Sequence, residues 1–144
     1  TKLVRNRGHK FDEDIETLPI VLDTYTETFN DNTSTVSFEN FPTKKATRKM
    51  IAVLRTLGLG PDLDRASNGR HRRAGRGTMR GRPTRTPRSL LFVVDEGKGL
   101  EKAVRNLPGV DVVQANKLST EDLAPGGDMG RLTIFTKEGL EAIQ

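Results

Sequence analysis

Apolar residues gather in short runs along this chain, and largely polar stretches separate the runs. Four of the runs predict strands, over residues 18–22, 90–94, 110–115 and 132–135. The second run, LLFVV, contains no polar residue, whereas Asp111 and Gln114 interrupt the third. Continuous apolar runs are typical of strands that are covered on both faces, as in a parallel sheet. The pattern therefore predicts a mainly parallel sheet flanked by helices.

Between these runs the apolar positions follow a helical period. One buried stripe is predicted in residues 43–57, and its members are Ala46, Met50, Val53, Leu54 and Leu57. Thr43 is placed to cap this helix and Gly58 to end it. The apolar spacing of residues 100–107 predicts a second helix of two turns, which a Pro-Gly pair ends.

Shorter elements complete the alternation of strands and helices. Ser119 or Thr120 is placed to cap a single helical turn, and Thr136 is placed to cap a terminal helix. This order implies right-handed crossovers and an open α/β sheet. Residues 23–41 are rich in Thr, Asn, Ser and Asp, and they predict a loop with a short hairpin around residues 30–32.

Residues 65–88 break the pattern, because no apolar residue recurs there at a helix or strand period. The stretch reads RASNGRHRRAGRGTMRGRPTRTPR, with four glycines, two prolines, no lysine and no acidic residue. Its basic residues are Arg65, Arg70, His71, Arg72, Arg73, Arg76, Arg80, Arg82, Arg85 and Arg88. The composition predicts an extended basic loop whose partner is another molecule.

The positive charge of the chain is concentrated in this loop. The whole sequence has 24 basic and 19 acidic side chains, a net charge of +5. Without the nine arginines of the loop it has 15 basic and 19 acidic side chains, a net charge of −4. A local basic surface indicates a site for a polyanion, and arginine favours paired hydrogen bonds to phosphate. The alternatives are a solvated linker, although linkers are usually mixed in charge, and an adaptor loop that binds an acidic protein.

A second basic surface is predicted on the helix over residues 43–57. A turn of about 100° per residue places three cations opposite the apolar stripe. They are Lys44, Arg48 and Arg55. These side chains form either a solvated face or a second contact for the same polyanion.

Length and composition bound the class of protein. The 144 residues are the size of one domain, and an apolar fraction of 33% supports only a modest core. The absence of cysteine excludes disulfides and thiolate metal sites. No apolar run approaches the roughly 20 residues of a membrane-spanning helix. We expect a single domain over residues 1–144, and we interpret the polar start at Thr1 as a sign of a longer chain.

Parallel sheets also occur in nucleotide-binding enzymes, so we considered an α/β nucleotide-dependent enzyme that acts on RNA. Such enzymes place a G-x-G-x-x-G turn directly after a strand, but the glycine-rich segments at residues 75–81 and 126–130 precede strands. The sequence has two histidines, His9 and His71, and it indicates no set of nucleophile, base and orienting group. The enzyme hypothesis requires a polar pocket at the carboxyl ends of the strands, near Asp95, Asn116 and Thr136.

Three segments of the chain resemble a known family. They are residues 73–82 (RAGRGTMRGR), residues 105–110 (RNLPGV) and residues 116–127 (NKLSTEDLAPGG), the last followed by Gly130 and Arg131. Together they are similar to the universal L-four family of large-subunit ribosomal proteins, in its archaeal and eukaryotic type. The resemblance covers the chain from about Arg5 onward, and LAPGG beside a Gly-Arg pair is a specific part of it.

The resemblance implies an α/β domain with a Rossmann-like sheet, which binds large-subunit ribosomal RNA, supports subunit assembly and translation, and has no catalytic role. It also implies that this chain is the carboxy-terminal portion, without the amino-terminal half and its tunnel extension. The implied partners are ribosomal RNA and neighbouring large-subunit ribosomal proteins of the cytoplasmic ribosome. No cofactor, metal, membrane or small-molecule substrate is implied. The polar stretch over residues 24–40 is longer than the family pattern predicts.

Carried onto this sequence, the resemblance makes the arginines of the loop and His71 contacts to phosphate and sugar. Gly75, Gly77 and Gly81 are expected to let the backbone approach RNA closely or to adopt a positive φ angle. Arg131 and the turn at Gly126 and Gly127 are expected to contact either RNA or a neighbouring ribosomal protein.

Overall fold

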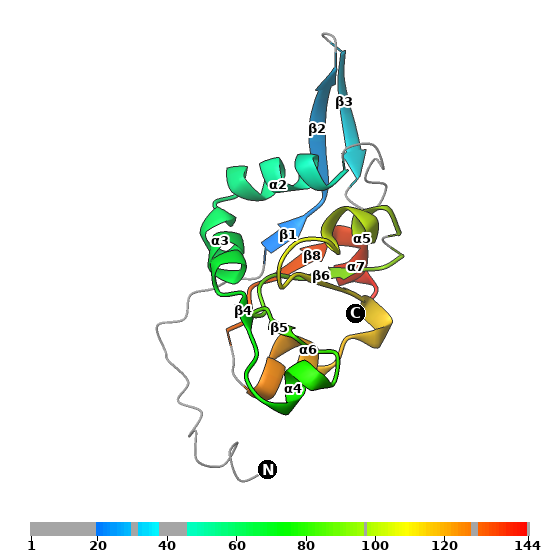
Figure 1. Cartoon of the computed structure of the whole chain (residues 1–144). Helices are drawn as coiled ribbons and strands as arrows, with labels where there is room; N and C mark the ends of the chain where they lie inside the picture. Colours follow the sequence, from blue (N-terminus) through cyan, green and yellow to red (C-terminus); the bar gives the residue numbers. More distant parts are fainter. Residues whose placement is uncertain (1–19, 30–31, 38–45, 97, 128–129, 144) are drawn as a thin grey trace.

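The computed structural model describes residues 20–29, 32–37, 46–96, 98–127 and 130–143 of the chain (Figure 1). In this part of the chain four parallel strands form the central sheet, in the order β1-β8-β6-β7. The strands are β1 (Ile20–Leu22), β6 (Leu91–Val94), β7 (Asp111–Gln114) and β8 (Thr133–Thr136). Each of them lies in or overlaps one of the four apolar runs, so the prediction of a mainly parallel sheet is confirmed.

Strand β6 lies in the interior of the sheet, between β8 and β7, and all four of its residues are buried. Successive side chains of a strand point to opposite faces. Phe92 and Val94 accordingly belong to the larger hydrophobic cluster, and Leu91 and Val93 belong to a smaller cluster with Ala115. The continuous apolar run in the sequence is therefore explained by burial on both faces.

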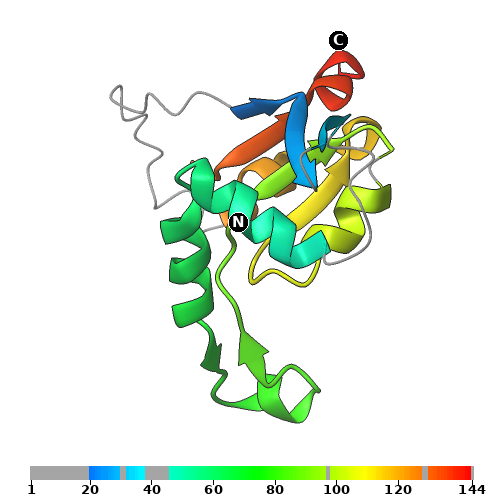
Figure 2. The same cartoon turned by 90° about the horizontal axis from the view of Figure 1, so that it is seen from above.

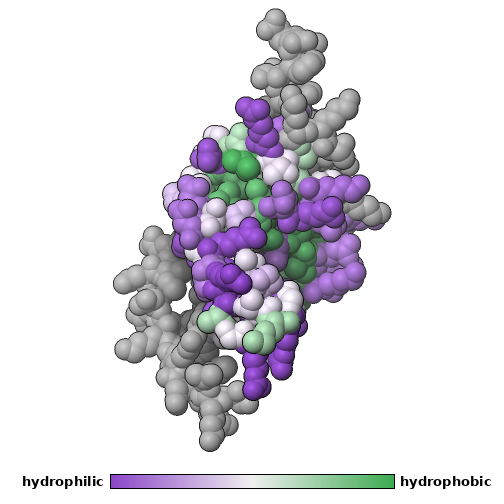
Figure 3. Space-filling view, viewed as in Figure 1, coloured by the Kyte–Doolittle hydropathy of each residue, from purple (hydrophilic) through white to green (hydrophobic). Residues whose placement is uncertain are grey.

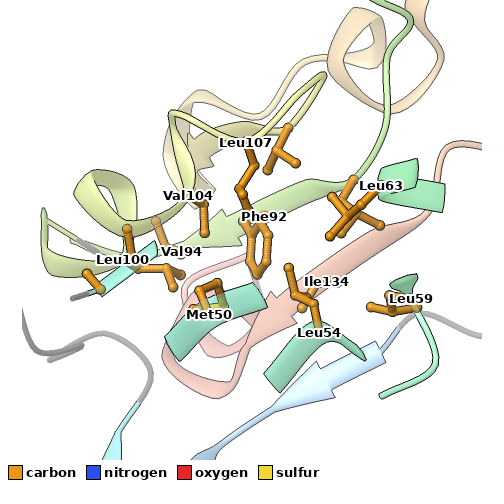
Figure 4. Packing of buried hydrophobic residues seen from close by; sticks show 14 residues of the cluster. Met50, Leu54, Leu59, Leu63, Phe92, Val94, Leu100, Val104, Leu107 and Ile134 are labelled. Carbon is orange, nitrogen blue, oxygen red and sulfur yellow. The ribbon is translucent and has the colours of Figure 1, made fainter. Parts of the chain in front are cut away.

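Three helices pack against the face that bears Phe92. They are α2 (Ala46–Thr56), α3 (Gly60–Asn68) and α5 (Lys98–Val104). Figure 4 shows Met50, Leu54 and Ile134 close to the ring of Phe92. On the other face lies α7 (Lys137–Glu141), where Gly139 lies so close to β6 that a Cβ there would come within 2.8 Å of the Val93 carbonyl oxygen.

The predicted helix over residues 43–57 is confirmed as α2 within its described part, and Thr43 lies outside the described residues. Leu57 was expected in the buried stripe, but its side chain is 40% exposed. The reason is that α2 ends at Thr56 and the chain turns at Gly58, whose φ is 79°. Helix α3 was not predicted, because its short apolar stripe runs into the basic stretch.

The short helices agree with the predicted caps. Ser119, and not Thr120, caps α6 (Thr120–Leu123), and it forms a capping box with Asp122. Thr136 caps α7 by accepting a hydrogen bond from the backbone N–H of Gly139. Two 3-10 turns, η1 (Ala115–Lys117) and η2 (Pro125–Gly127), flank α6 in the sequence.

The polar stretch after β1 forms an antiparallel hairpin of β2 (Thr24–Phe29) and β3 (Asn32–Ser37). A short hairpin around residues 30–32 was expected, and the pairing instead extends from Thr24 opposite Ser37 to Phe29 opposite Asn32. Thr recurs at alternate positions in β2, and β-branched residues favour strands. In Figure 1 the hairpin projects from the end of the molecule opposite α4.

The helices of the described part are short. The longest, α2, has 11 residues, and none of them has the length and apolar character needed to cross a membrane.

Candidate nucleic-acid interface

The basic stretch forms a projection that we call the arginine arm, residues 70–86. It leaves the end of α3 and returns at the start of β6 through β4 (His71–Arg72), the helical turn α4 (Arg76–Met79) and β5 (Thr84–Arg85). His71 lies opposite Arg85 and Arg72 opposite Thr84 in an antiparallel pair. Figure 2 shows the arm extending away from the sheet.

The arm holds its shape through hydrogen bonds of its own backbone. The N–H of Arg73 donates to the carbonyl oxygen of Pro83 at 2.8 Å, and the N–H of Arg82 donates to Gly77 at 3.0 Å. The hydroxyl of Thr78 donates to the carbonyl oxygen of Arg73 at 2.6 Å. The predicted extended loop is therefore wrong in its local structure, because a hydrogen-bonded ribbon with a turn at its tip needs no apolar core.

Four of the five singled-out glycines adopt positive φ angles, which was one of the two expectations for Gly75 and Gly81 and was not predicted for Gly126 and Gly127. The values are 75° for Gly75, 73° for Gly81, 76° for Gly126 and 82° for Gly127. Gly77 lies inside α4 and is not among the glycines with positive φ, so for this residue only the close approach to RNA stays a prediction. Gly75 immediately precedes α4, where the left-handed conformation lets the ribbon turn into the helix.

The side chains of six arginines of the arm donate no hydrogen bond to the described part of the chain and form no ion pair with it. They are Arg70, Arg72, Arg76, Arg80, Arg82 and Arg85, and all of them are exposed. Arg73 is also exposed and donates from Nε to the carbonyl oxygen of Thr84 at 3.2 Å, and Nδ1 of His71 lies 3.0 Å from the carbonyl oxygen of Gly69. Hydrophilic side chains accordingly project at the lower end of the described surface (Figure 3).

The arginines at the base of the arm bind carboxylates of the chain itself. Nη2 of Arg65 lies 2.7 Å from Asp62 and donates to the carbonyl oxygen of Arg88 at 2.9 Å. Nη1 of Arg88 contacts both carboxylate oxygens of Asp111, at 2.7 and 2.5 Å. Ser89 completes the anchor, because its hydroxyl donates to the second oxygen of Asp62. Both ends of the arm are therefore tied to the body of the protein.

Arg131 is enclosed by the protein, with a side chain that is only 5% exposed. Its guanidinium donates to the carbonyl oxygens of Ser89, Leu90 and Asp122, and it forms an ion pair with Asp111 at 2.5 Å. The predicted RNA contact at Arg131 does not fit this burial. We assign the side chain to the support of the arm's base, because it joins the start of β6 to that of β7.

The second basic surface lies apart from the arm. Arg48 and Arg55 are exposed on α2, and Lys44 lies outside the described residues. In Figure 1 α2 and the arm are at opposite ends of α3. The structure therefore does not bring Arg48 and Arg55 together with the arginines of the arm.

The loop that faces the base of the arm is fixed by the cap of α6. Asp122 accepts hydrogen bonds from the hydroxyl and the backbone N–H of Ser119, at 2.7 and 3.1 Å. These bonds, the side-chain one foremost, hold the pKa of Asp122 below its ordinary value of 3.8. The same residue presents its backbone carbonyl to Arg131, so the cap helps to position the acceptor of a buried cation.

Sequence reasoning missed Asp62 and Asp111, which hold the base of the arm. Asp111 carried a usable signal, because a charged residue within an otherwise apolar strand usually has a partner. That partner lies 20 residues away in Arg131 and 23 residues away in Arg88, so its identity depends on the fold.

The site required by the enzyme hypothesis is not formed by the expected residues. A groove of about 340 Å³ at the carboxyl ends of β6 and β7 is lined by residues that include Glu96, Glu101, Gln114 and Lys117, but by none of Asp95, Asn116 and Thr136. Among the described residues no group of three or more His, Asp or Glu is arranged to hold a metal ion.

Comparison with known proteins finds a family and curated relatives that match most of the chain. Residues 21–144 match the family described as ribosomal protein L4/L1. The large ribosomal subunit protein uL4 of Halobacterium salinarum is 38% identical over 143 residues, which are 99% of this chain and 51% of that protein. The proteins of the same name from Thermoplasma acidophilum and Methanocaldococcus jannaschii are each 42% identical, over 98% and 99% of this chain and 49% and 50% of theirs. The chain thus spans about half the length of these curated relatives.

Proposed function

Because this chain belongs to the ribosomal protein L4/L1 family, we propose that it is a structural, RNA-binding constituent of the large ribosomal subunit. Its partners are large-subunit ribosomal RNA and neighbouring ribosomal proteins of the cytoplasmic ribosome. It supports assembly of the subunit and translation, and it has no catalytic role, cofactor, metal or small-molecule substrate.

The observation that carries this proposal is the state of the arm's arginines. Six guanidinium groups are exposed on one projection, and within the described chain they have no acceptor. Each guanidinium offers five N–H donors in a planar fork that matches a phosphate group. A projection with this many available donors and no acidic residue favours a polyanion as its partner.

The arm is expected to position the protein on RNA more than to read its sequence. Most hydrogen bonds between proteins and nucleic acids go to phosphate and sugar, which carry no sequence information. The arm's arginines and His71 supply these contacts, and Gly77 and Gly81 allow the backbone near the tip to approach the RNA. Arg48 and Arg55 supply a second, separate contact, together with Lys44.

Sedimentation with ribosomal particles tests the proposal that the chain is a constituent of the large subunit. The tagged wild-type protein should co-sediment with large-subunit particles. Replacing Arg72, Arg76 and Arg80 together by alanine should reduce that fraction several-fold, because each lost phosphate contact weakens binding. The proposal would be overturned if the wild-type protein sedimented separately from the large-subunit particles.

A binding measurement with purified RNA supplies the matched control. The chain should bind one fragment of large-subunit ribosomal RNA more tightly than a scrambled RNA of equal length and composition. The double variant Arg48→Ala with Arg55→Ala should retain this preference, because α2 contributes a separate contact. Equal affinity for specific and scrambled RNA would reduce the proposal to non-specific polyanion binding.

A further inference from the structure

A groove of about 590 Å³ lies between the base of the arm and the segment that leads into β8. Its cationic lining includes Arg65, Arg85 and Arg88, and its apolar lining includes Pro87, Pro125 and Leu132. Ser89 and Leu132 precede β6 and β8, so the groove is at the amino ends of the strands. It is therefore distinct from the carboxyl-end crevice in which α/β enzymes bind nucleotides.

Two of the cations are held in place before any ligand arrives. Arg65 is bound to Asp62 and to the backbone of Arg88, and Arg88 is bound to Asp111. Their side chains nevertheless remain 56% and 60% exposed. Arg88 uses one terminal nitrogen for its contacts to Asp111, which leaves further N–H donors of its fork available. A side chain that is already ordered loses less conformational entropy when it binds a ligand.

The third cation connects the groove with the arm. Arg85 lies in β5, opposite His71, and in the described part of the chain its guanidinium has no hydrogen-bond acceptor. It also lines the groove. RNA bound along the exposed arginines of the arm would therefore contact the edge of the groove at Arg85.

The walls of the groove favour a ligand with a flat apolar part. Proline rings and a leucine provide surface that a bare phosphate ion does not use. The volume lies within the roughly 300–1,000 Å³ of pockets that bind organic ligands. The carboxylate of Asp62 also lines the groove, and its charge disfavours a second phosphate beside the first.

We propose that this groove binds one unpaired nucleotide of RNA, with its phosphate at Arg85 and Arg88 and its base against Pro87 and Pro125. Proteins commonly recognise RNA through bases that are splayed out of the helix and stacked on side chains, arginine planes among them. This inference rests on the proposed RNA-binding function and adds a site at which one nucleotide is captured.

Titration of the ¹⁵N-labelled full chain with adenosine 5′-monophosphate tests the groove directly. The amide signals of Ser89, Gly130 and Leu132 should shift in a saturable way. Inorganic phosphate at the same concentration should shift them weakly. Arg85→Ala should lower the affinity for the nucleotide about tenfold, because it removes a charge-assisted hydrogen bond to the phosphate. Lys102→Ala, which removes an exposed cation of α5, should leave the affinity unchanged.

Several outcomes would overturn the inference. Equal binding of phosphate and nucleotide would show that the groove binds anions without recognising a nucleotide. Amide shifts confined to residues 70–82 would show that the nucleotide binds the arm and not the groove. Retained nucleotide affinity in Arg85→Ala, with the dispersed amide spectrum of the wild type, would exclude the phosphate position.

Photocrosslinking provides a second measurement in the RNA complex itself. With 4-thiouridine in the RNA, an unpaired nucleotide should crosslink to peptides that contain residues 87–89 or 125–132. Crosslinks found only within residues 70–82 would overturn the groove and leave the arm's function intact. Failure of the chain to bind the RNA at all would instead overturn the proposed function.

Discussion

The arginines at the base of the arm and those along it differ in what they bind. Arg65, Arg88 and Arg131 contact carboxylates and carbonyl oxygens of the chain itself. The six exposed arginines between residues 70 and 85 have no such acceptor in the described structure. One residue type thus serves two purposes: the base fixes the direction of the arm, and the arm carries the available charge.

The comparison teaches that charge in the sequence is not the same as charge available to a partner. Nine arginines occur in residues 65–88, but two of them are paired with Asp62 and Asp111. Arg65 and Arg88 also line the groove, where carboxylates hold them and their side chains nevertheless remain more than half exposed.

The largest effect on stability is expected at the base. Asp111→Ala removes the carboxylate that balances Arg131, whose side chain is 5% exposed, and should lower the free energy of unfolding by about 3 kcal/mol. Urea denaturation measures this loss. Arg88→Ala is the control, because its side chain is 60% exposed and its ion pair with Asp111 should contribute at most about 1 kcal/mol. Equal losses in the two variants would contradict the distinction between buried and exposed arginines.

A somewhat smaller effect is expected where the end of the arm meets the turn before β7. Gly109 has φ of 72°, and a Cβ there would lie 2.2 Å from the carbonyl oxygen of Pro87. Gly109→Ala should therefore destabilise the protein by about 2–3 kcal/mol through strain and overlap. Gly81→Ala shares the positive φ without a nearby atom and should lose only about 1–2 kcal/mol. Thermal unfolding of the two variants separates strain from overlap.

The cap of α6 should contribute less. Ser119→Ala removes the side-chain acceptor of the capping box and should cost about 1 kcal/mol at neutral pH. The pKa of Asp122 is lowered in the folded state, so its stabilisation is present above the ordinary value of 3.8 and is lost as pH falls through the folded pKa. The stability difference between wild type and Ser119→Ala should accordingly shrink on acidification. A difference that grows at low pH would contradict this assignment.

Much of the fold could be predicted from the sequence. The four strand runs and the caps at Ser119 and Thr136 are local patterns, and the structure confirms them. Helix α3 was missed because its apolar stripe is short, and the buried Ala66 already lies within the basic stretch. The order of the strands could not be predicted, because pairing such as that of Ile20 with Ile134 joins residues far apart in the chain.

The sequence indicated where the candidate site lies. It did not indicate which of its arginines bind groups of the chain itself and which remain exposed. The absence of acids from residues 65–88 identified the basic segment. Its ribbon structure depends on backbone hydrogen bonds such as that from Arg73 to Pro83, and such bonds leave no periodic pattern in the sequence. The burial of Arg131 was equally hidden, because Gly-Arg before a strand has the same appearance whether the arginine faces solvent or the protein. The proposed roles of the arm's arginines in RNA binding remain predictions.

The most direct test of the distinction between the arginines along the arm and those at its base is the salt dependence of RNA binding by an arm variant that keeps its fold. Replacing Arg72, Arg76 and Arg80 by alanine should change the free energy of unfolding by no more than about 0.5 kcal/mol, the smallest effect on stability expected here. The log–log slope of affinity against salt should nevertheless fall by about 2 to 3, since each lost phosphate contact removes roughly 0.7 to 0.9. An unchanged slope in the folded variant would contradict the central claim that the arm's arginines bind RNA.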